Sequence, residues 1–473
     1  MHASGARHLA RKTTKSGSAF QSSGQFNFCI SFGIRVFIIE SAQDLSAYPF
    51  SPSLTEPVMN SSLSSDVMVL GAGIVGVTLA LKLQDHGHHV MLIDRGEPGA
   101  ATSFGNAGLI ERSSVFPYAF PRDLRTLIAY ALQRKPAAHY HWQALPSLLP
   151  WLGSYWRHSS PRHYPDAIAG ALPLIEHSWS EHEPLIEAAG ASALVNHHGW
   201  IKVWRSEESE HASLQQAEQS RDYGLNVRVL SRDDLHEKEP SLASSLRGGV
   251  HYPDSRQIQD PQDLTTAYVR LFTQRGGRLL HGDARSLTCD EGRWHLQTHN
   301  GPARAPHVAV ALGPWGAELA KRLGYRLMMG VKRGYHMHFG SEASPLRHVI
   351  VDVDQGYALA PMKKGIRLTT GAEFTHRDAR PTPVQLDALE PIARRLHPLG
   401  DRLDAAPWVG SRPCTSDMLP VIGPAPAHRG LWFCFGHAHH GLTQAASSGR
   451  LLAEMISGRE TYADPTPYRI DRF

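Results

Sequence analysis

The sequence has few cysteines and no long apolar run, and both absences narrow the range of proteins it can encode. Its four cysteines are scattered over 473 residues without Cys-x-x-Cys spacing: Cys29, Cys289, Cys414 and Cys434. This pattern excludes a disulfide-built fold and a zinc ribbon, and it fits a reducing compartment. No stretch of about 18 apolar residues occurs, so the sequence predicts no membrane-spanning helix.

The sequence also lacks a large excess of positive or negative charge once the N-terminus is set aside. The formal net charge is +4, and the first 39 residues carry five basic residues and no acid. The remainder is nearly neutral and has no basic stripe of the kind that binds nucleic acid. Apolar residues make up 41% and charged residues 19% of the chain. We therefore expect a globular enzyme, long enough for two domains.

The first 60 residues are rich in serine and glycine, and Arg35 interrupts their one apolar run, Phe28–Ile39. A basic, Ser-rich, acid-free start is typical of a mitochondrial transit peptide. The apolar run faintly resembles a secretory signal, but no small-residue cleavage site follows it. We favour a third interpretation, in which translation begins at Met59. Residues 1–60 are left out of the fold prediction.

The first strong motif is a glycine-rich turn after a short apolar run. Val67–Leu70 has the composition of a buried parallel strand, and Gly71-x-Gly73-x-x-Gly76 follows it directly. Gly71 permits a tight turn, Gly73 lets a pyrophosphate approach the backbone, and Gly76 lets helix and strand pack closely. The apolar-periodic helix that follows would point its free N–H groups at the phosphates. The motif predicts a dinucleotide-binding turn.

A second apolar run, Val90–Ile93, is closed by Asp94, 18 residues after Gly76. At that position a carboxylate accepts hydrogen bonds from ribose hydroxyls. An acid here disfavours NADP, but it does not separate NAD from FAD.

The segment after Asp94 reads Arg-Gly-Glu-Pro-Gly-Ala-Ala-Thr-Ser-Phe-Gly-Asn-Ala-Gly and ends at Gly108. An NAD domain would enter its next helix here, whereas this loop resembles the flavin-contacting segment of the FAD-dependent D-amino-acid oxidase and dehydrogenase superfamily. It is most similar to bacterial D-amino-acid dehydrogenases of the small-subunit type. The resemblance extends from about Ser64 to Gly458 and implies FAD as the cofactor.

The resemblance implies an α/β fold of two domains: a Rossmann-like FAD domain of the glutathione-reductase type and a substrate domain built from an antiparallel sheet plus helices. The residue patterns agree, because residues 112–249 are mostly helical in pattern and residues 331–370 alternate like antiparallel strands. The Trp-rich piece His141–Trp151 offers an apolar surface for a membrane or a partner, but we favour packing in the core. We expect these boundaries: 1–62, an N-terminal extension, disordered or not translated; 63–113, 250–328 and 405–462, the discontinuous FAD domain; 114–249 and 329–404, the substrate domain; 463–473, a C-terminal tail.

The stretch Gly410-Ser-Arg-Pro-Cys-Thr-Ser-Asp-Met-Leu-Pro-Val-Ile-Gly423 resembles the family motif Gly-x-Arg-Pro-x-Thr-x-Asp-x-x-Pro-x-x-Gly. The resemblance implies that Arg412 holds the substrate carboxylate, a role that suits a planar guanidinium with two parallel donors. It also implies a tyrosine hydroxyl as a second ligand, Tyr357, with Tyr335 as the competing candidate. In relatives that oxidise sarcosine a cysteine holds the flavin covalently. Cys414 does not match that spacing, so we expect non-covalent FAD.

The stretch Phe435-Gly-His-Ala-His-His-Gly-Leu-Thr443 places three histidines in four positions. It lies between an apolar strand and a helix expected from Thr443, so it is a strand-to-helix turn whose N–H groups can stabilise negative charge on reduced flavin. The family carries Gly-His at this turn, which matches Gly436-His437. No Asp, Glu or Cys cluster nearby completes a metal site, and we expect none. His437 is expected to be structural or flavin-lining rather than a base, and His439 and His440 to line the pocket and tune substrate choice.

The resemblance implies oxidative deamination of D-amino acids to 2-oxo acids and ammonia, with hydride transfer from Cα to flavin N5. The alternative on the same scaffold is a secondary-amine or imino-acid substrate: D-proline, hydroxyproline, sarcosine or glycine. A non-catalytic flavoprotein and an FAD-dependent tRNA-modifying enzyme are disfavoured by the neutral charge and the Arg412 motif. We expect a quinone of the respiratory chain or O₂ as electron acceptor, no nucleic acid, and a cytoplasmic protein that can attach peripherally to the inner membrane.

These expectations define two sets of candidate residues. The substrate or catalytic set is Arg412, Tyr357, Tyr335, His437 and His440. The cofactor set is Gly71, Ala72, Gly73, Ile74, Val75, Gly76, Asp94, Arg95, Thr102, Ser103, Asn106, Ala107, Gly108, Gly313, Gly436, Gly441, Leu442 and Thr443.

Overall fold

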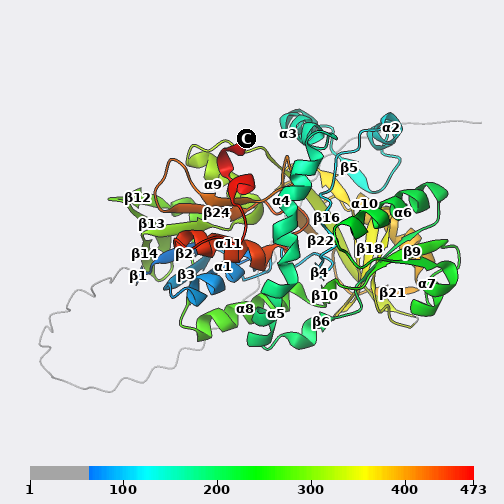
Figure 1. The fold of residues 1–473 in the computed structure, drawn as a ribbon, viewed down its shortest axis with the longest axis horizontal. Helices are drawn as coiled ribbons and strands as arrows, with labels where there is room; N and C mark the ends of the chain where they lie inside the picture. Colours follow the sequence, from blue (N-terminus) through cyan, green and yellow to red (C-terminus); the bar gives the residue numbers. More distant parts are fainter. Residues whose placement is uncertain (1–62, 343) are drawn as a thin grey trace, which may run out of the picture. The chain divides into compact units, whose positions relative to one another are not determined.

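A computed structural model describes residues 63–342 and 344–473. The start at Met59 and the two targeting alternatives lie outside the described residues. The chain divides after Met59, and residues 60–473 form one compact unit. Within that unit two sheets, one mostly parallel and one mostly antiparallel, carry the fold (Figure 1).

The parallel sheet has six strands in the order β11-β3-β2-β15-β24-β23. Their bounds are Arg278–His281, Val90–Asp94, Val67–Leu70, His307–Val310, Leu431–Phe435 and Val421–Pro424, and only β23 runs antiparallel to its neighbour. The strands predicted at residues 67–70 and 90–93 and the apolar strand predicted before the three-histidine turn are therefore confirmed, and β15 joins them into one sheet. All four residues of β2 are buried, as the unbroken apolar run requires in a sheet covered on both faces.

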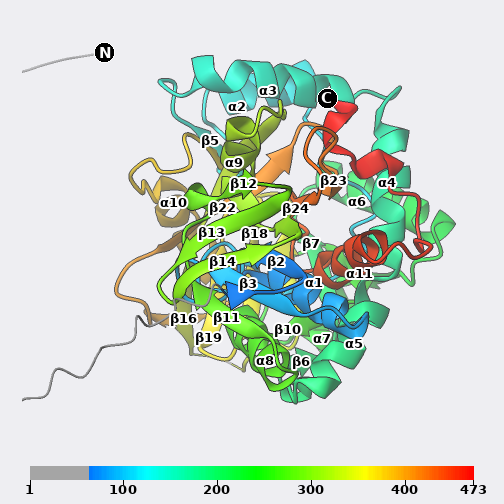
Figure 2. The same cartoon turned by 90° about the vertical axis from the view of Figure 1, so that its left-hand side faces the viewer.

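Helices α1 (Ile74–Asp85), α8 (Pro261–Gln274) and α11 (Ala445–Ile456) cover one face of this sheet with an apolar core. In Figure 2, α1 and α11 lie side by side, and Gly449 permits this contact because a Cβ there would lie 2.9 Å from the Leu79 amide nitrogen. The Asp260 side chain caps α8 by accepting hydrogen bonds from the amides of Gln262 and Asp263.

A small four-stranded sheet covers the other face through a second apolar core. Its strands, in spatial order, are β1 (Leu63–Ser64), β14 (Gly301–Ala305), β13 (Arg293–Thr298) and β12 (Thr288–Asp290). Trp294 is its largest buried side chain. Short α9 (Gly316–Arg322) packs beside it.

The second large sheet forms the right half of Figure 1. Its main path is β5-β20-β16-β19-β18-β17-β7-β9-β8, and β21 and β22 also pair with β16. Most neighbours are antiparallel, as predicted, although β7–β17 and β5–β20 are parallel. The bounds are Ala138–Tyr140 (β5), Ala372–Phe374 (β20), Met329–Ser341 (β16), Gly365–Thr369 (β19), Tyr357–Met362 (β18), Val349–Asp352 (β17), Trp200–Trp204 (β7), Gly248–Tyr252 (β9), Arg228–Ser231 (β8), Leu399–Arg402 (β21) and Trp408–Thr415 (β22).

The remaining elements are a three-stranded sheet and seven helices. The sheet joins β4 (Leu109–Ile110), β10 (Arg256–Ile258) and β6 (Val195–Asn196). The helices are α2 (Leu124–Ala131), α3 (Leu145–His158), α4 (Tyr164–Glu176), α5 (Ser178–Ala188), α6 (Glu207–Asp222), α7 (Arg232–Lys238) and α10 (Val384–Leu396). Among the described residues no helix combines the length and the apolar character needed to cross a bilayer.

Two details differ from the expected division into domains. The predicted boundary at residue 250 cuts β9, which belongs to the large sheet through β7 and β8. β22, which was assigned to the FAD domain, also belongs to the large sheet because all eight of its residues pair with β16. Hydrogen bonding across strands overrides sequence proximity here. The division of residues 60–473 into FAD and substrate domains otherwise stays a prediction.

The expectation that the Trp-rich piece at 141–151 packs in the core is half wrong. Trp151 is 4% exposed and stacks on Tyr155, whereas Trp142 is 73% exposed and Leu149 60% exposed. The piece leads into an amphipathic helix, and only one face of α3 meets the body of the protein.

Candidate active site

A cavity of about 1610 Å³ lies where the parallel sheet meets the large sheet. Its wall includes the Gly71 turn, the loop after Asp94, β16, β18, β22 and the three-histidine turn. Pockets for drug-sized ligands hold roughly 300–1000 Å³, so this cavity has room for a dinucleotide and a small substrate together.

The glycine-rich turn is built as the motif predicts. Gly71 has φ = +107°, and a Cβ there would lie 2.5 Å from the carbonyl oxygen of Ala311. A Cβ at Gly76 would overlap the Gly71 carbonyl oxygen, so helix α1 reaches β2 only because no side chain intervenes. At Gly73 a Cβ would meet only the Ser103 hydroxyl, 3.2 Å away. The first-turn N–H groups of α1 therefore border the cavity where glycines leave the backbone uncovered by side chains. A pyrophosphate could approach the backbone closely there.

Asp94 ends β3 next to this turn. Its carboxylate accepts hydrogen bonds from the Ala72 amide at 2.6 Å and from the Gly96 amide at 2.9 Å. Both bonds fix the orientation of the carboxylate while Asp94 still lines the cavity. Each oxygen retains a lone pair, so the group can receive ribose hydroxyls there.

The loop from residue 100 to 108 is held by its own side chains and by the large sheet. Ser103 accepts a hydrogen bond from the Ile74 amide, and Asn106 bonds to the backbone of Ser103 and Gly108. From β19, the buried Arg367 donates to the carbonyl oxygens of Phe104 at 2.9 Å and Asn106 at 2.7 Å. The loop is thus fixed between the two sheets, where a flavin ring would lie.

A chain of side chains in turn fixes Arg367. His338 accepts from Arg367 through Nε2 at 2.9 Å, and its Nδ1 donates to Asp404 at 2.7 Å. Burial would raise the pKa of Asp404, but hydrogen bonds from Lys364 and His338 outweigh it and lower that pKa to about 2. A carboxylate that stays ionised keeps His338 in the tautomer that accepts from Arg367.

The three-histidine turn lies between β24 and α11, and α11 begins at Ala445 rather than Thr443. His437 bonds to the Ser448 hydroxyl at 3.0 Å, and burial lowers its pKa to about 3. Burial also lowers the pKa of His440 to about 4, and neither ring nitrogen of His440 has a hydrogen-bond partner among residues 63–342 and 344–473. Burial, with Arg412 and Lys332 nearby, lowers the pKa of His439 as well. All three rings are neutral at pH 7 and form cavity wall.

Arg412 lies on β22 and faces the cavity. Its Nη1 donates to the carbonyl oxygens of Gly371 at 2.8 Å and Arg333 at 3.3 Å, and its Nη2 donates to Thr370 at 3.2 Å. An arginine has five N–H donors, so two remain, one on Nε and one on Nη2. Two donors are what one carboxylate takes from a guanidinium.

The two candidate tyrosines differ in the hydrogen bonding of their hydroxyls. Tyr335 is saturated, because it receives from Arg333 and the Thr382 amide and donates to Glu373 at 2.9 Å. The hydroxyl of Tyr357, a residue only 2% exposed, has no partner in hydrogen-bonding geometry, although Asp352 and Arg205 lie near enough to affect its pKa. Burial raises the pKa of Tyr357, so its hydroxyl stays protonated. Of the two, only the Tyr357 hydroxyl is not held by another described group in hydrogen-bonding geometry, and a ligand would compete with Asp352 for its proton.

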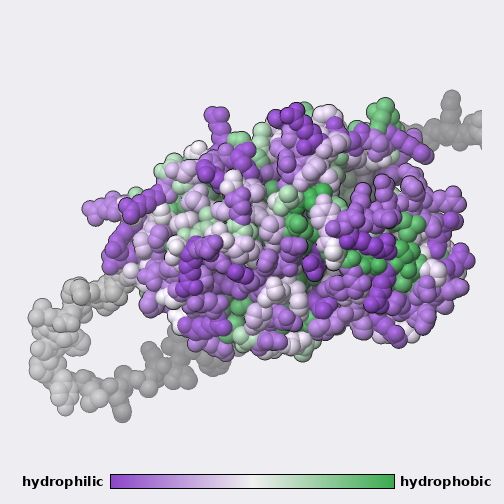
Figure 3. Space-filling model, in the orientation of Figure 1, coloured by the Kyte–Doolittle hydropathy of each residue, from purple (hydrophilic) through white to green (hydrophobic). Residues whose placement is uncertain are grey.

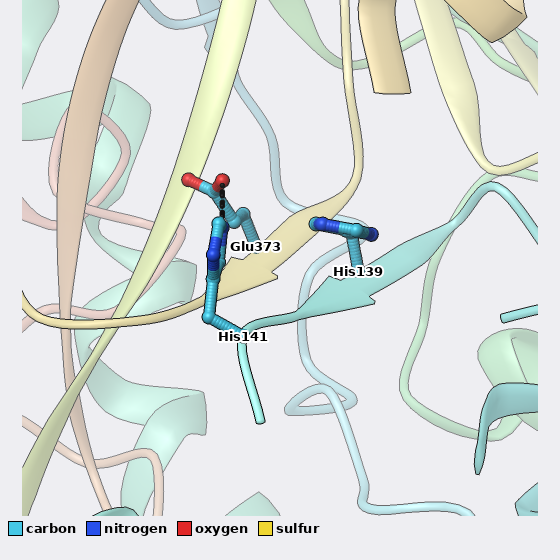
Figure 4. Close-up of side chains that lie close together, drawn as sticks. All are labelled: His139, His141 and Glu373. Carbon is cyan, nitrogen blue, oxygen red and sulfur yellow. Dashed lines mark hydrogen bonds and ion pairs between the residues drawn. The ribbon is translucent and has the colours of Figure 1, made fainter. Parts of the chain in front are cut away.

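Two groups among the described residues have the composition of a metal site, and neither includes the three-histidine turn: His139, His141 and Glu373, and His336, His338 and Asp404. In Figure 4, His141 points at Glu373, with 2.9 Å between Nε2 and Oε1, while His139 makes no such bond. Glu373 also pairs with Arg333 and accepts from Tyr335 and Thr382. Its charge and oxygens are already used, so the group ties β5, β16 and β20 together.

The structure gathers most of the candidate residues around one cavity. All five of the substrate set line it, and so do thirteen of the eighteen cofactor residues. The other five, Ala72, Gly76, Gly108, Gly436 and Thr443, lie behind the wall and shape its turns. Thr443, for example, donates to the Leu109 carbonyl oxygen at 3.1 Å.

Sequence reasoning missed several polar residues of the wall, among them Glu111, Tyr118, Lys202 and Lys332. Tyr118 is 58% exposed because it borders the cavity, and its ring lies 4.5 Å from that of His439. None of the four belongs to a recognisable motif. The only signal for Lys332 was the alternation that placed it on a strand with its side chain on the face opposite Arg333.

The glycine-rich turn at residues 71–76, Asp94 and the loop at residues 100–108 have the features that bind FAD. Gly71, Gly73 and the N-terminus of α1 would hold the pyrophosphate, Asp94 the ribose, and the loop to Gly108 together with the three-histidine turn the isoalloxazine.

Comparison with known proteins agrees with this geometry. The family described as "DAO: FAD dependent oxidoreductase" matches residues 66–455. The D-amino-acid oxidase of Bradyrhizobium diazoefficiens is 29% identical over 86% of this chain and 98% of its own length. A D-amino acid dehydrogenase of Cereibacter sphaeroides is 30% identical over 86% of this chain and 95% of its own. The crystal structure of glycine oxidase from Geobacillus kaustophilus superposes with a TM-score of 0.67 at 25% identity, over 87% of this chain and all of the other.

Proposed function

This chain belongs to the DAO family of FAD-dependent oxidoreductases, and we propose that it oxidises D-amino acids to 2-oxo acids and ammonia. The observation that carries this proposal is Arg412, whose two remaining donors face the cavity and match one carboxylate. The relatives named as D-amino-acid oxidase and dehydrogenase support the choice of D-amino acids. The FAD, when bound, supplies the hydride acceptor.

The side chains bind and orient the substrate. Arg412 would hold the α-carboxylate through two parallel bonds, and the Tyr357 hydroxyl would donate a third. Fixing the carboxylate positions Cα in the cavity and restricts the orientations in which the Cα–H can face the flavin. His437, His439 and His440 are neutral and exclude water from that side of the cavity. Hydrolysis of the imine product then needs only solvent.

The proposal is tested by mixing the yellow holoenzyme anaerobically with a panel of D-, L- and N-substituted amino acids. Bleaching of the flavin absorption by D-amino acids is the expected result. A flavin that stays oxidised with every D-amino acid refutes the proposal. Bleaching by sarcosine or D-proline alone would assign a secondary-amine substrate, and bleaching by glycine alone would assign glycine, an alternative that the likeness to a glycine oxidase supports.

We further propose that the protein binds peripherally to anionic membranes through a surface made by residues 118–163, here called the α2–α3 surface. No residue of α2 is buried. Figure 3 shows apolar surface where α2 lies in Figure 1. The exposed apolar side chains are Leu124, Ile128, Leu132, Trp142, Leu149 and Trp156.

The excess of basic residues on the α2–α3 surface favours an anionic bilayer as its binding partner. Residues 118–163 contain six basic side chains and one acid, Asp123, while the rest of the protein is nearly neutral. Basic residues near an anionic leaflet contribute about 1 kcal/mol each, and tryptophan favours the interface. Leu127, Tyr130 and Leu145 of the same elements line the active-site cavity. A membrane quinone would therefore reach the flavin from this side, which favours it over O₂ as acceptor.

Co-sedimentation with vesicles tests the membrane proposal. We expect binding to vesicles of phosphatidylcholine with phosphatidylglycerol and weak binding to phosphatidylcholine alone. Trp142→Ser with Arg134→Ser should abolish it, whereas Leu403→Ser, which changes a residue 43% exposed elsewhere, should not. Equal binding by all three proteins would contradict the assignment of the surface.

A further inference from the structure

A second cation stands beside Arg412 in the cavity wall. Lys332 on β16 is the direct cross-strand partner of Arg412 on β22, so the two side chains leave the same face of the sheet about 5 Å apart at their Cβ atoms. Lys332 is 4% exposed and lines the cavity. Its ammonium donates to the Tyr155 hydroxyl at 2.9 Å and lies 4.2 Å from the centre of that ring. Two of its three N–H donors are left over.

Neither cation has a carboxylate partner among the described residues. The groups that affect the pKa of Lys332 through their charge are Cys414 and Arg412, and for Arg412 they are Cys414 and Tyr118. Two cations elsewhere in the fold do have a carboxylate partner, Arg333 with Glu373 at 2.8 Å and the partly buried Lys82 with Glu181 at 2.5 Å. The buried Arg367 has none in the described part of the chain but donates to His338 and two carbonyl oxygens. The carboxylates of the cavity wall lie elsewhere, and Glu111 is near Lys202 instead.

A buried cation without an anion is unfavourable unless a ligand supplies one. Loss of the proton is the alternative, and burial does lower the pKa of Lys332, to about 8. At pH 7 most of the population is still charged. One substrate carboxylate satisfies the two free donors of Arg412. The two unused donors of Lys332 therefore need a second anionic group.

We propose that Lys332 forms a second anion subsite, with His439 beside it, and that the preferred substrates are dicarboxylic amino acids. This inference rests on the proposed function, in which Arg412 holds the α-carboxylate. The side-chain carboxylate of aspartate or glutamate would then accept from the Lys332 ammonium. His439 lies close enough to both cations to feel their charge, and one of its ring nitrogens, Nδ1, has no protein partner. An anion at Lys332 would also favour a proton on that ring.

The test compares two acids that lack the amine, so that binding is measured without turnover. Propionate has the carbon skeleton of alanine and succinate that of aspartate. Each is titrated into the oxidised holoenzyme and followed by the perturbation of the flavin absorption. The variants are Lys332→Met, which keeps the length of the side chain and removes its charge, and Lys321→Met as a control on an exposed lysine of α9.

We expect succinate to bind at least tenfold more tightly than propionate to the native protein and to the Lys321→Met control. Lys332→Met should weaken succinate at least tenfold and leave propionate within twofold. Equal affinities for the two acids in the native protein would overturn the inference. So would an equal loss for both acids in Lys332→Met, because that result places Lys332 on the α-carboxylate together with Arg412. FAD content and melting temperature of each variant identify a misfolded protein, and Lys332→Gln then replaces it.

Anaerobic reduction by D-aspartate, D-glutamate, D-asparagine and D-alanine separates this inference from the proposed function. Faster reduction by the two acids, lost in Lys332→Met, supports both. Reduction by D-alanine with no preference for the acids refutes the subsite alone. Absence of reduction by any of the four, with succinate binding still dependent on Lys332, refutes the oxidation of D-amino acids and leaves the anion subsite standing.

Discussion

Replacement of Arg412 tests the centre of the proposed site. Arg412→Ala removes two charge-assisted bonds to the substrate carboxylate, each worth about 1.5–3 kcal/mol net of the bonds that water makes to the free groups. Because water entering the variant's cavity can replace part of this interaction, substrate binding should weaken by about 2–4 kcal/mol. At 1.4 kcal/mol for each factor of ten, KM should rise about 30- to 700-fold.

The same change also removes the three bonds to the carbonyl oxygens of Arg333, Thr370 and Gly371. These hold β22 against the neighbouring strands, so the free energy of unfolding should fall by about 1–3 kcal/mol. Binding and stability must therefore be measured separately. Arg412→Lys keeps the charge but cannot serve the three carbonyls and a carboxylate together, and an intermediate rise in KM is expected.

The assay is the rate of anaerobic flavin reduction against substrate concentration, with the dissociation constant of propionate as a second reading. Arg395→Ala is the matched control, because Arg395 is exposed on α10 and has no ion pair among the described residues. An Arg412→Ala variant that binds FAD, stays folded at the assay temperature and retains its KM would refute the assignment of Arg412 to the substrate carboxylate.

Three further predictions follow from contacts around the cavity. Gly334→Ala should raise KM about as much as Arg412→Lys and spare FAD binding, because a Cβ there would lie 2.5 Å from Nη1 of Arg412; unchanged kinetics would show that the guanidinium can move freely. Arg367→Met should weaken the binding of FAD, because the carbonyl oxygens of Phe104 and Asn106 lose their donor. Flavin fluorescence on dilution measures the dissociation constant of FAD, and an unaltered value would show that Arg367 does not hold the loop for FAD binding. Asp404→Asn should destabilise the protein by roughly 2 kcal/mol at pH 7. The folded pKa of Asp404 is lowered to about 2 from the usual value near 4, so this contribution is present above pH 4 and is lost as pH falls toward 2. Urea unfolding of both proteins at pH 7 and pH 3 measures the difference, and a gap that does not shrink on acidification would contradict the assignment.

The sequence alone determined the features whose cause is local. The strand, glycine turn and helix of residues 67–85 were predicted within one or two residues, because a buried strand needs an apolar run and the turn needs Gly71 and Gly76. The loop after Asp94 and the Arg412 motif pointed to FAD through their resemblance to a family.

Only the tertiary structure decided which distant residues meet. Arg412 and Lys332 are 80 positions apart and become neighbours because β22 pairs with β16, a pairing that no local pattern specifies. Tyr335 and Tyr357 look alike in sequence, yet the hydroxyl of one is saturated by Arg333 and Glu373 and that of the other is free. Trp142 and Trp151 belong to one apolar stretch, and the packing of α3 buries one and exposes the other. Local propensity fixes backbone conformation over a few residues, whereas contacts between elements depend on how whole sheets and helices close around a common core.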